Sequence, residues 1–171
     1  MKTNGWIPAA LCAAFAAHAQ APSPPSCDTP QHHEMDFWLG DWEAHYAQNG
    51  VQAQSHNRIT RTLGGCVIQE EFMGAPGIPL EGRSWSVYDR VAGRWKQTWV
   101  DNTGAYLDFV GSVEDGNRVF ARQFVRQGKT IMQRMVFRDV KPDAFKWLWQ
   151  GSADGGATWT TAWEIDYRRV K

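Results

Sequence analysis

The chain has 171 residues, and its 18 Lys and Arg side chains balance its 18 Asp and Glu side chains. No basic run is present, so nucleic acids and anionic membrane surfaces are disfavoured as partners. The 10 tryptophans are the compositional anomaly. In a β-protein most of them are expected in core and cross-strand packing, with stacking against a ligand as the alternative.

Residues 1–19 have the features of a secretory signal peptide. Lys2 provides a basic start, residues 7–17 form an apolar run, and cleavage is predicted after Ala19. The apolar run is shorter than the roughly 20 residues needed to span a bilayer, and no later segment is a better candidate. We therefore expect an exported, periplasmic protein without a membrane span.

Residues 20–33 are rich in proline and are predicted to form an extended leader, with a short helical turn near the start of the folded domain. After cleavage two cysteines remain, Cys27 in the leader and Cys66 at the start of a strand-like run. Disulfides persist in exported proteins, so we expect a Cys27–Cys66 bridge, with two free thiols as the alternative.

From Asp41 onward the sequence alternates with period two, which is the pattern of half-buried strands. Turn pairs such as Asn49-Gly50 separate the runs, and no helical stretch lies between them. A long meander closes on itself, so residues 34–171 are predicted to form one all-β domain, a ten-stranded antiparallel up-and-down barrel. The expected strands lie near 41–47, 52–62, 66–73, 83–88, 94–101, 105–112, 118–125, 129–138, 144–151 and 158–169.

The stretch Gly40-x-Trp42 resembles the G-x-W signature of calycins, the superfamily of lipocalins and fatty-acid-binding proteins. In that superfamily the tryptophan closes one end of the barrel, and an arginine near the end of the last strand packs across its indole. The resemblance therefore implies structural roles for Trp42 and for an arginine at Arg168 or Arg169, of which Arg168 is the predicted one.

Four further stretches resemble an uncharacterised bacterial family, a domain of unknown function with a calycin-type barrel. They are "DFWLGDW", "LGGC" with a following Glu pair, "GRWKQTWVDNTG" and "SADGGATW". Met35 stands where that family has phenylalanine. The likeness covers residues 34–169 and implies the fold, but it implies no chemistry.

The segment 152–159 also matches the Asp-box pattern S-x-D-x-G-x-T-W of sialidases. Its physical role is a hairpin turn, in which Asp154 accepts backbone hydrogen bonds, Gly156 supplies positive φ and Trp159 folds back. Sialidase propellers repeat the box, whereas it occurs once here. We therefore interpret it as structural.

The histidines offer a second functional hypothesis. Residues 32–36, His-His-Glu-x-Asp, contain donors for Zn²⁺ or Cu²⁺, with His45 or His56 as further ligands. Adjacent histidines on a flexible segment are more often solvated, so no metal site is predicted. Nitrobindins, which are ten-stranded calycins, bind haem through a C-terminal histidine, but this chain has none after His56 and no cofactor is predicted.

Alternation with Ile68 and Phe72 places the Glu70 side chain on the lumen face. A buried carboxylate needs a partner, and Arg122 and Arg134 are the candidates. This network either fills the barrel or anchors a ligand. The predicted ligand-binding residues are Trp99 and Trp149 for an apolar wall, Gln97 and Tyr106 for hydrogen bonds, and Glu70, Arg122 and Arg134 for a polar head group.

Barrels of this size commonly hold one small ligand. The sequence contains no nucleophile elbow, zinc-protease motif or reactive-cysteine context. We therefore expect non-catalytic binding of a small apolar or amphipathic molecule. The alternatives are an isomerase or hydrolase that acts within the lumen, and a filled barrel that serves as an interaction module.

Overall fold

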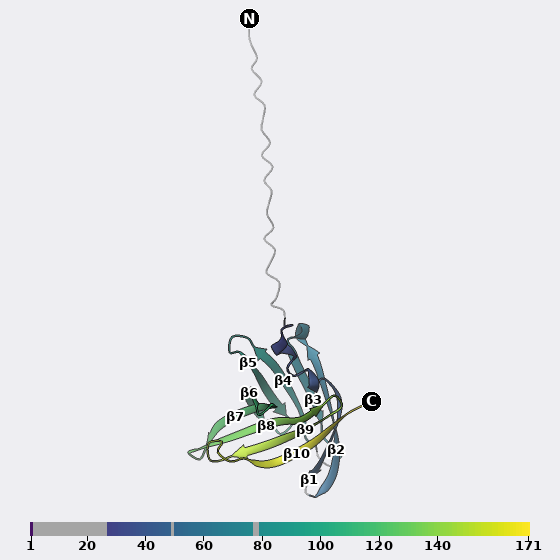
Figure 1. The fold of residues 1–171 in the computed structure, drawn as a ribbon, viewed down its shortest axis with the longest axis vertical. Coiled ribbons are helices and arrows are strands. Elements are labelled where there is room, and N and C mark those ends of the chain that lie inside the picture. Colours follow the sequence, from purple (N-terminus) through teal and green to yellow (C-terminus); the bar gives the residue numbers. More distant parts are fainter. Residues whose placement is uncertain (2–26, 49, 77–78) are drawn as a thin grey trace.

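The computed structural model describes Met1 and residues 27–48, 50–76 and 79–171. In these residues ten antiparallel strands form a closed barrel, preceded by two short 3₁₀ segments (Figure 1). The predicted all-β, ten-stranded antiparallel barrel is confirmed. The elements are η1 (Pro30–His33), η2 (Asp36–Trp38), β1 (Gly40–Gln48), β2 (Val51–Thr62), η3 (Leu63–Gly65), β3 (Val67–Met73), β4 (Glu81–Asp89), β5 (Arg94–Asp101), β6 (Tyr106–Glu114), β7 (Asn117–Arg126), β8 (Lys129–Lys141), β9 (Ala144–Ser152) and β10 (Thr160–Arg169).

Apart from Met1, the predicted signal peptide and its cleavage site lie outside the described residues. The segments η1 and η2 form the short helical turn expected before the barrel. Among the described residues, no helix is both long enough and apolar enough to cross a membrane.

Each strand pairs with its neighbours in sequence, and β1 closes the barrel by pairing with β10. Tight turns set the register, as between β6 and β7, where Asp115 and Gly116 have φ of 49° and 79°. Two positive φ angles are the geometry of a type I′ hairpin turn. Directly paired residues share a face, so every second residue of a regular strand points into the lumen.

One end of the barrel, where β1 begins, is closed by a buried plug, which we define as residues 35–42 together with Arg169. The Trp42 indole Nε1 donates a hydrogen bond to the Trp38 carbonyl oxygen at 2.8 Å. The Arg169 guanidinium carbon lies 4.1 Å from the Trp42 ring centroid. Arg169 also donates hydrogen bonds to the carbonyl oxygens of Leu39 at 2.6 Å and Phe37 at 3.2 Å. The last strand and the segment before the first strand are thereby joined.

The arginine that covers Trp42 is Arg169, so the assignment of this role to Arg168 is wrong by one residue. Trp42 lies opposite Arg169 in the β1–β10 register, whereas Arg168 lies opposite Glu43 and is exposed. Gly40 has φ of 127°, and a Cβ atom there would lie 2.2 Å from an Arg169 guanidinium nitrogen. The glycine of G-x-W is therefore required by the arginine that packs beside it.

The segment before the plug is fixed to the barrel wall by a disulfide. Cys27 and Cys66 are bonded across a sequence separation of 39, which confirms the predicted bridge. Arg61 adds a polar link, because it donates a hydrogen bond to the His32 carbonyl oxygen at 3.0 Å and pairs with the Asp36 carboxylate. These contacts place the plug over the end of the lumen.

The Asp-box segment forms the turn between β9 and β10. Asp154 accepts a hydrogen bond from the Thr158 backbone N–H at 3.0 Å, and Gly156 has φ of 91°. Hydrogen bonds from Thr158 hold the pKa of the Asp154 carboxyl group well below its usual range. The Trp159 ring lies 4.0 Å from the guanidinium carbon of Arg134 on the outside of the barrel. These contacts are those of a hairpin turn, which is the structural role expected for the Asp-box segment.

Candidate functional site

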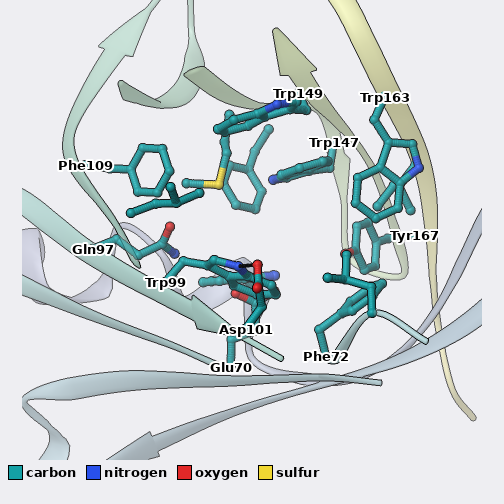
Figure 2. Close-up of a pocket in the computed structure, with 16 residues that line it drawn as sticks. Glu70, Phe72, Gln97, Trp99, Asp101, Phe109, Trp147, Trp149, Trp163 and Tyr167 are labelled. Atoms are coloured by element: carbon teal, nitrogen blue, oxygen red, sulfur yellow. Dashed lines mark hydrogen bonds between the residues drawn. The ribbon is translucent and has the colours of Figure 1, made fainter. Parts of the chain in front are cut away.

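A cavity of about 240 Å³ lies within the barrel, between the plug and the far ends of the strands. This volume is just below the roughly 300–1,000 Å³ that is typical of small-molecule sites. Side chains from several strands converge on it (Figure 2). The lining residues are Trp38, Glu70, Phe72, Leu80, Gln97, Trp99, Asp101, Leu107, Phe109, Met135, Phe137, Trp147, Trp149, Trp163, Ile165 and Tyr167.

Four tryptophans line the cavity, and in Figure 2 Trp147 and Trp149 lie at its top, Trp163 at its right and Trp99 below. Trp147 and Trp149, two residues apart on β9, have nearly parallel rings with centroids 6.3 Å apart. Trp163 meets Trp147 edge to face at 5.7 Å. These three rings and Trp99 are only partly buried, whereas Trp42 in the plug is fully buried. The four indoles therefore keep apolar surface that the protein does not cover.

A buried polar network lies at the level of Glu70. The Glu70 carboxyl group accepts hydrogen bonds from Asn57 Nδ2 at 2.8 Å and from Ser84 Oγ at 2.6 Å. Gln97 Nε2 donates to Ser84 Oγ at 3.3 Å and to Ser86 Oγ at 3.0 Å. The partners of Glu70 are thus neutral side chains from neighbouring strands, and the proposed pairing with Arg122 or Arg134 is corrected.

Burial raises the pKa of Glu70, because desolvation disfavours its charged form. Hydrogen bonds from Ser84 and Asn57 act in the opposite direction but do not cancel the effect. Burial and the nearby Glu70 charge also raise the pKa of Tyr167 well above its usual value. Both groups are therefore held toward their neutral forms in the middle of the lumen.

Asp101 is a second carboxyl group in the lining, at the end of β5. Its Oδ2 atom accepts a hydrogen bond from Trp99 Nε1 at 2.9 Å, and Oδ1 accepts one from the Thr103 backbone N–H at 2.9 Å. Burial acts to raise the pKa of Asp101, but hydrogen bonds from Thr103, Trp99 and Ala105 outweigh it and lower the pKa. The two lumen carboxyl groups are thus shifted in opposite directions.

Four of the seven predicted ligand-binding residues are brought together in the lining: Glu70, Gln97, Trp99 and Trp149. The other three are Tyr106, Arg122 and Arg134, and they do not line the cavity.

Tyr106 is 68% exposed, and its neighbour Leu107 lines the cavity instead. Arg134 lies outside the barrel, where it donates hydrogen bonds to Gln150 at 2.7 Å and Glu114 at 3.0 Å. The expectation that these two side chains face the lumen is therefore corrected. Alternation separates the two faces of a strand but does not identify which face is interior.

Arg122 packs its guanidinium carbon 4.9 Å from the Phe124 ring centroid and 5.9 Å from that of Phe109. Phe109 belongs to the lining, but Arg122 does not. Asp101 and Trp163 belong to it and were missed as ligand-binding candidates. Alternation could have found both, because Asp101 shares a strand face with Gln97 and Trp99, and Trp163 shares one with Tyr167.

The histidine-rich segment is explained by local contacts. His33 bridges the carboxyl groups of Asp28 at 2.7 Å and Asp36 at 2.6 Å, and these hydrogen bonds raise its pKa. His32 is buried, and its Nδ1 atom lies 2.8 Å from Thr29 Oγ1. In the described part of the chain, no group of three or more His, Cys, Asp or Glu side chains is arranged to hold a metal ion.

The ten-stranded barrel with its G-x-W plug defines a protein of calycin type. A family model described as Protein of unknown function (DUF1579) matches residues 28–169, and the chain belongs to this family. Among solved structures, the S-type phycobiliprotein lyase CPES from Guillardia theta is similar, with 14% sequence identity and a TM-score of 0.47. That match covers 80% of this chain and 90% of the lyase. No protein of curated function matches the sequence significantly.

Proposed function

We propose that this protein binds a small apolar or amphipathic molecule in the lumen of its barrel and does not transform it. The observation that carries the proposal is the aromatic cavity, into which Trp99, Trp147, Trp149 and Trp163 present partly buried rings. Small-molecule sites are typically concave and mostly apolar, with a few polar groups that orient the ligand. Glu70, Gln97 and Asp101 are the polar groups here.

The proposed location is the periplasm. The Cys27–Cys66 disulfide indicates a non-cytoplasmic environment, because cytosolic thiols are kept reduced. The signal-peptide features of residues 1–19 support export. A ligand would therefore be held outside the cytoplasm.

Binding of octan-1-ol, a neutral amphipathic probe, tests the proposed function, with affinity measured by isothermal titration calorimetry. Trp149→Ala removes one wall of the cavity, and we expect about fivefold weaker binding, since about 40 Å² of lost apolar contact corresponds to about 1 kcal/mol. Trp85→Ala is the matched control, because Trp85 lies outside the lining and is 39% exposed. An absence of octan-1-ol binding to the unsubstituted protein would reject the proposal.

Catalysis in the lumen is the second candidate function, and Glu70 is the observation that favours it. A cavity carboxyl group with a raised pKa has the properties of a general acid or base. Glu70→Gln discriminates between the candidates once a co-purified molecule is known. Lost turnover with retained binding would favour an enzyme, and lost binding would favour a carrier. The filled-barrel alternative is disfavoured by the cavity itself.

A further inference from the structure

The ionisable side chains in the cavity lining are all acidic. Glu70 and Asp101 contribute carboxyl groups to the lining, and within the described residues no Lys, Arg or His belongs to it. The hydrogen-bond donors to Glu70 are the neutral side chains of Asn57 and Ser84, and Asp101 accepts from the neutral Trp99 indole. A negative charge in this lumen therefore has no basic side chain beside it in the lining.

Asp101 lies at the end of the barrel away from the plug. At the start of β5, the Trp95 indole Nε1 donates a hydrogen bond to the Gln31 carbonyl oxygen in the plug-side segment at 3.1 Å. Asp101 is the last residue of the same strand, so it lies at the opposite end of the lumen. Its lowered pKa keeps the carboxylate charged at neutral pH. A ligand whose apolar part enters the lumen first would place its polar head group beside this carboxylate.

The aromatic lining favours the same kind of head group. The face of an indole ring carries partial negative charge and attracts ammonium groups more strongly than the faces of other aromatic side chains do. Trp99 Nε1 donates a hydrogen bond to Asp101 Oδ2, so an indole and a carboxylate lie together at the end of the cavity away from the plug. Trp147, Trp149 and Trp163 also line the cavity.

We infer that the lumen selects cationic amphipathic molecules, in which an amine lies beside Asp101 and Trp99 while an apolar body packs among the other indoles. This inference rests on the proposed function and names its ligand class. An alkyl carboxylate would instead bring its negative charge toward Asp101, with no basic partner in the lining. The inference therefore predicts an order of affinity set by head-group charge.

Three eight-carbon probes with different head groups test the inference: octylamine, octan-1-ol and octanoate. Calorimetric titrations at pH 7 and low salt use the mature, disulfide-bonded protein. We expect octylamine to bind at least tenfold more tightly than octan-1-ol, and octanoate to bind more weakly than octan-1-ol. Added salt should weaken octylamine binding and leave octan-1-ol binding nearly unchanged.

Asp101→Asn should remove most of the preference for octylamine, whereas the matched variant Asp108→Asn should keep it, because Asp108 is exposed and outside the lining. If Asp101→Asn does not fold, the salt dependence for the unsubstituted protein decides the question instead. Equal binding of the three probes, or octylamine binding that is insensitive to salt, would overturn the inference.

The outcomes separate this inference from the proposed function. If octan-1-ol does not bind, the proposed function fails. If octan-1-ol binds but octylamine is not preferred, only the inference on charge fails. Tighter binding of octanoate would point instead to Arg122, whose Nε and Nη1 atoms are buried without a hydrogen-bond partner in the described residues.

Discussion

At the scale of single residues, Glu70 is an acidic side chain held in an unusual environment in the lumen. Its buried carboxyl group has neutral hydrogen-bond partners, and burial raises its pKa. In the unfolded chain a glutamate loses its proton near pH 4.3. As the pH rises through this range, the unfolded state releases the proton while the folded state retains it. Linkage then requires the free energy of unfolding to fall, up to the raised pKa of the folded state.

Glu70→Gln should remove this pH-dependent loss, because the amide has a similar shape and no charge. We expect the unfolding free energy of the variant, relative to that of the unsubstituted protein, to increase from pH 4 to pH 8. Any lost hydrogen bond shifts this difference by a constant, so the slope is the readout. Urea unfolding at several pH values measures it.

The matched control for that experiment is Glu71→Gln, which removes a carboxyl group from the opposite face of β3. Glu71 lies outside the cavity lining and within 3.8 Å of Arg83. If Glu71→Gln gave the same increase with pH, burial of Glu70 would not be the cause.

At the scale of secondary-structure elements, the plug joins both ends of the barrel chain. Arg169→Ala should lower the unfolding free energy by roughly 2–3 kcal/mol, because it removes a cation–π contact and hydrogen bonds to two plug carbonyl groups. Arg168 is exposed, so Arg168→Ala should change the unfolding free energy by about 0.5 kcal/mol or less. Equal losses for the two variants in urea unfolding would contradict this account of the plug.

The strands show which part of the structure could be predicted from sequence. Turn residues and period-two alternation located all ten strands, and alternation grouped Gln97 with Trp99 on one face of β5. It could not identify the interior face of β8, where residues 131–137 are apolar on both faces. Arg134 is outside because the neighbouring Met135 packs into the core. Which face of β8 points inward depends on how the closed sheet curves, and the sequence of a single strand does not determine that curvature.

At the scale of the whole molecule, a closed barrel with a plugged end leaves an aromatic cavity, and local patterns predicted only part of its lining. Its volume depends on how the inward side chains of many strands fit together, and a change at any of them alters it. The preceding segment is attached through the Cys27–Cys66 disulfide. The fold was therefore predictable from sequence, whereas the size and charge of its lumen required the structure.

Native mass spectrometry of the natively expressed, disulfide-bonded protein tests the central claim most directly. The account predicts a mass above that of the polypeptide, with the excess lost on denaturation, and a polypeptide mass two hydrogens below that of the reduced chain. An absorption spectrum of the same sample would identify a chromophoric ligand. A protein that carries no excess mass and also fails to bind octan-1-ol would contradict the claim that the lumen is a binding site.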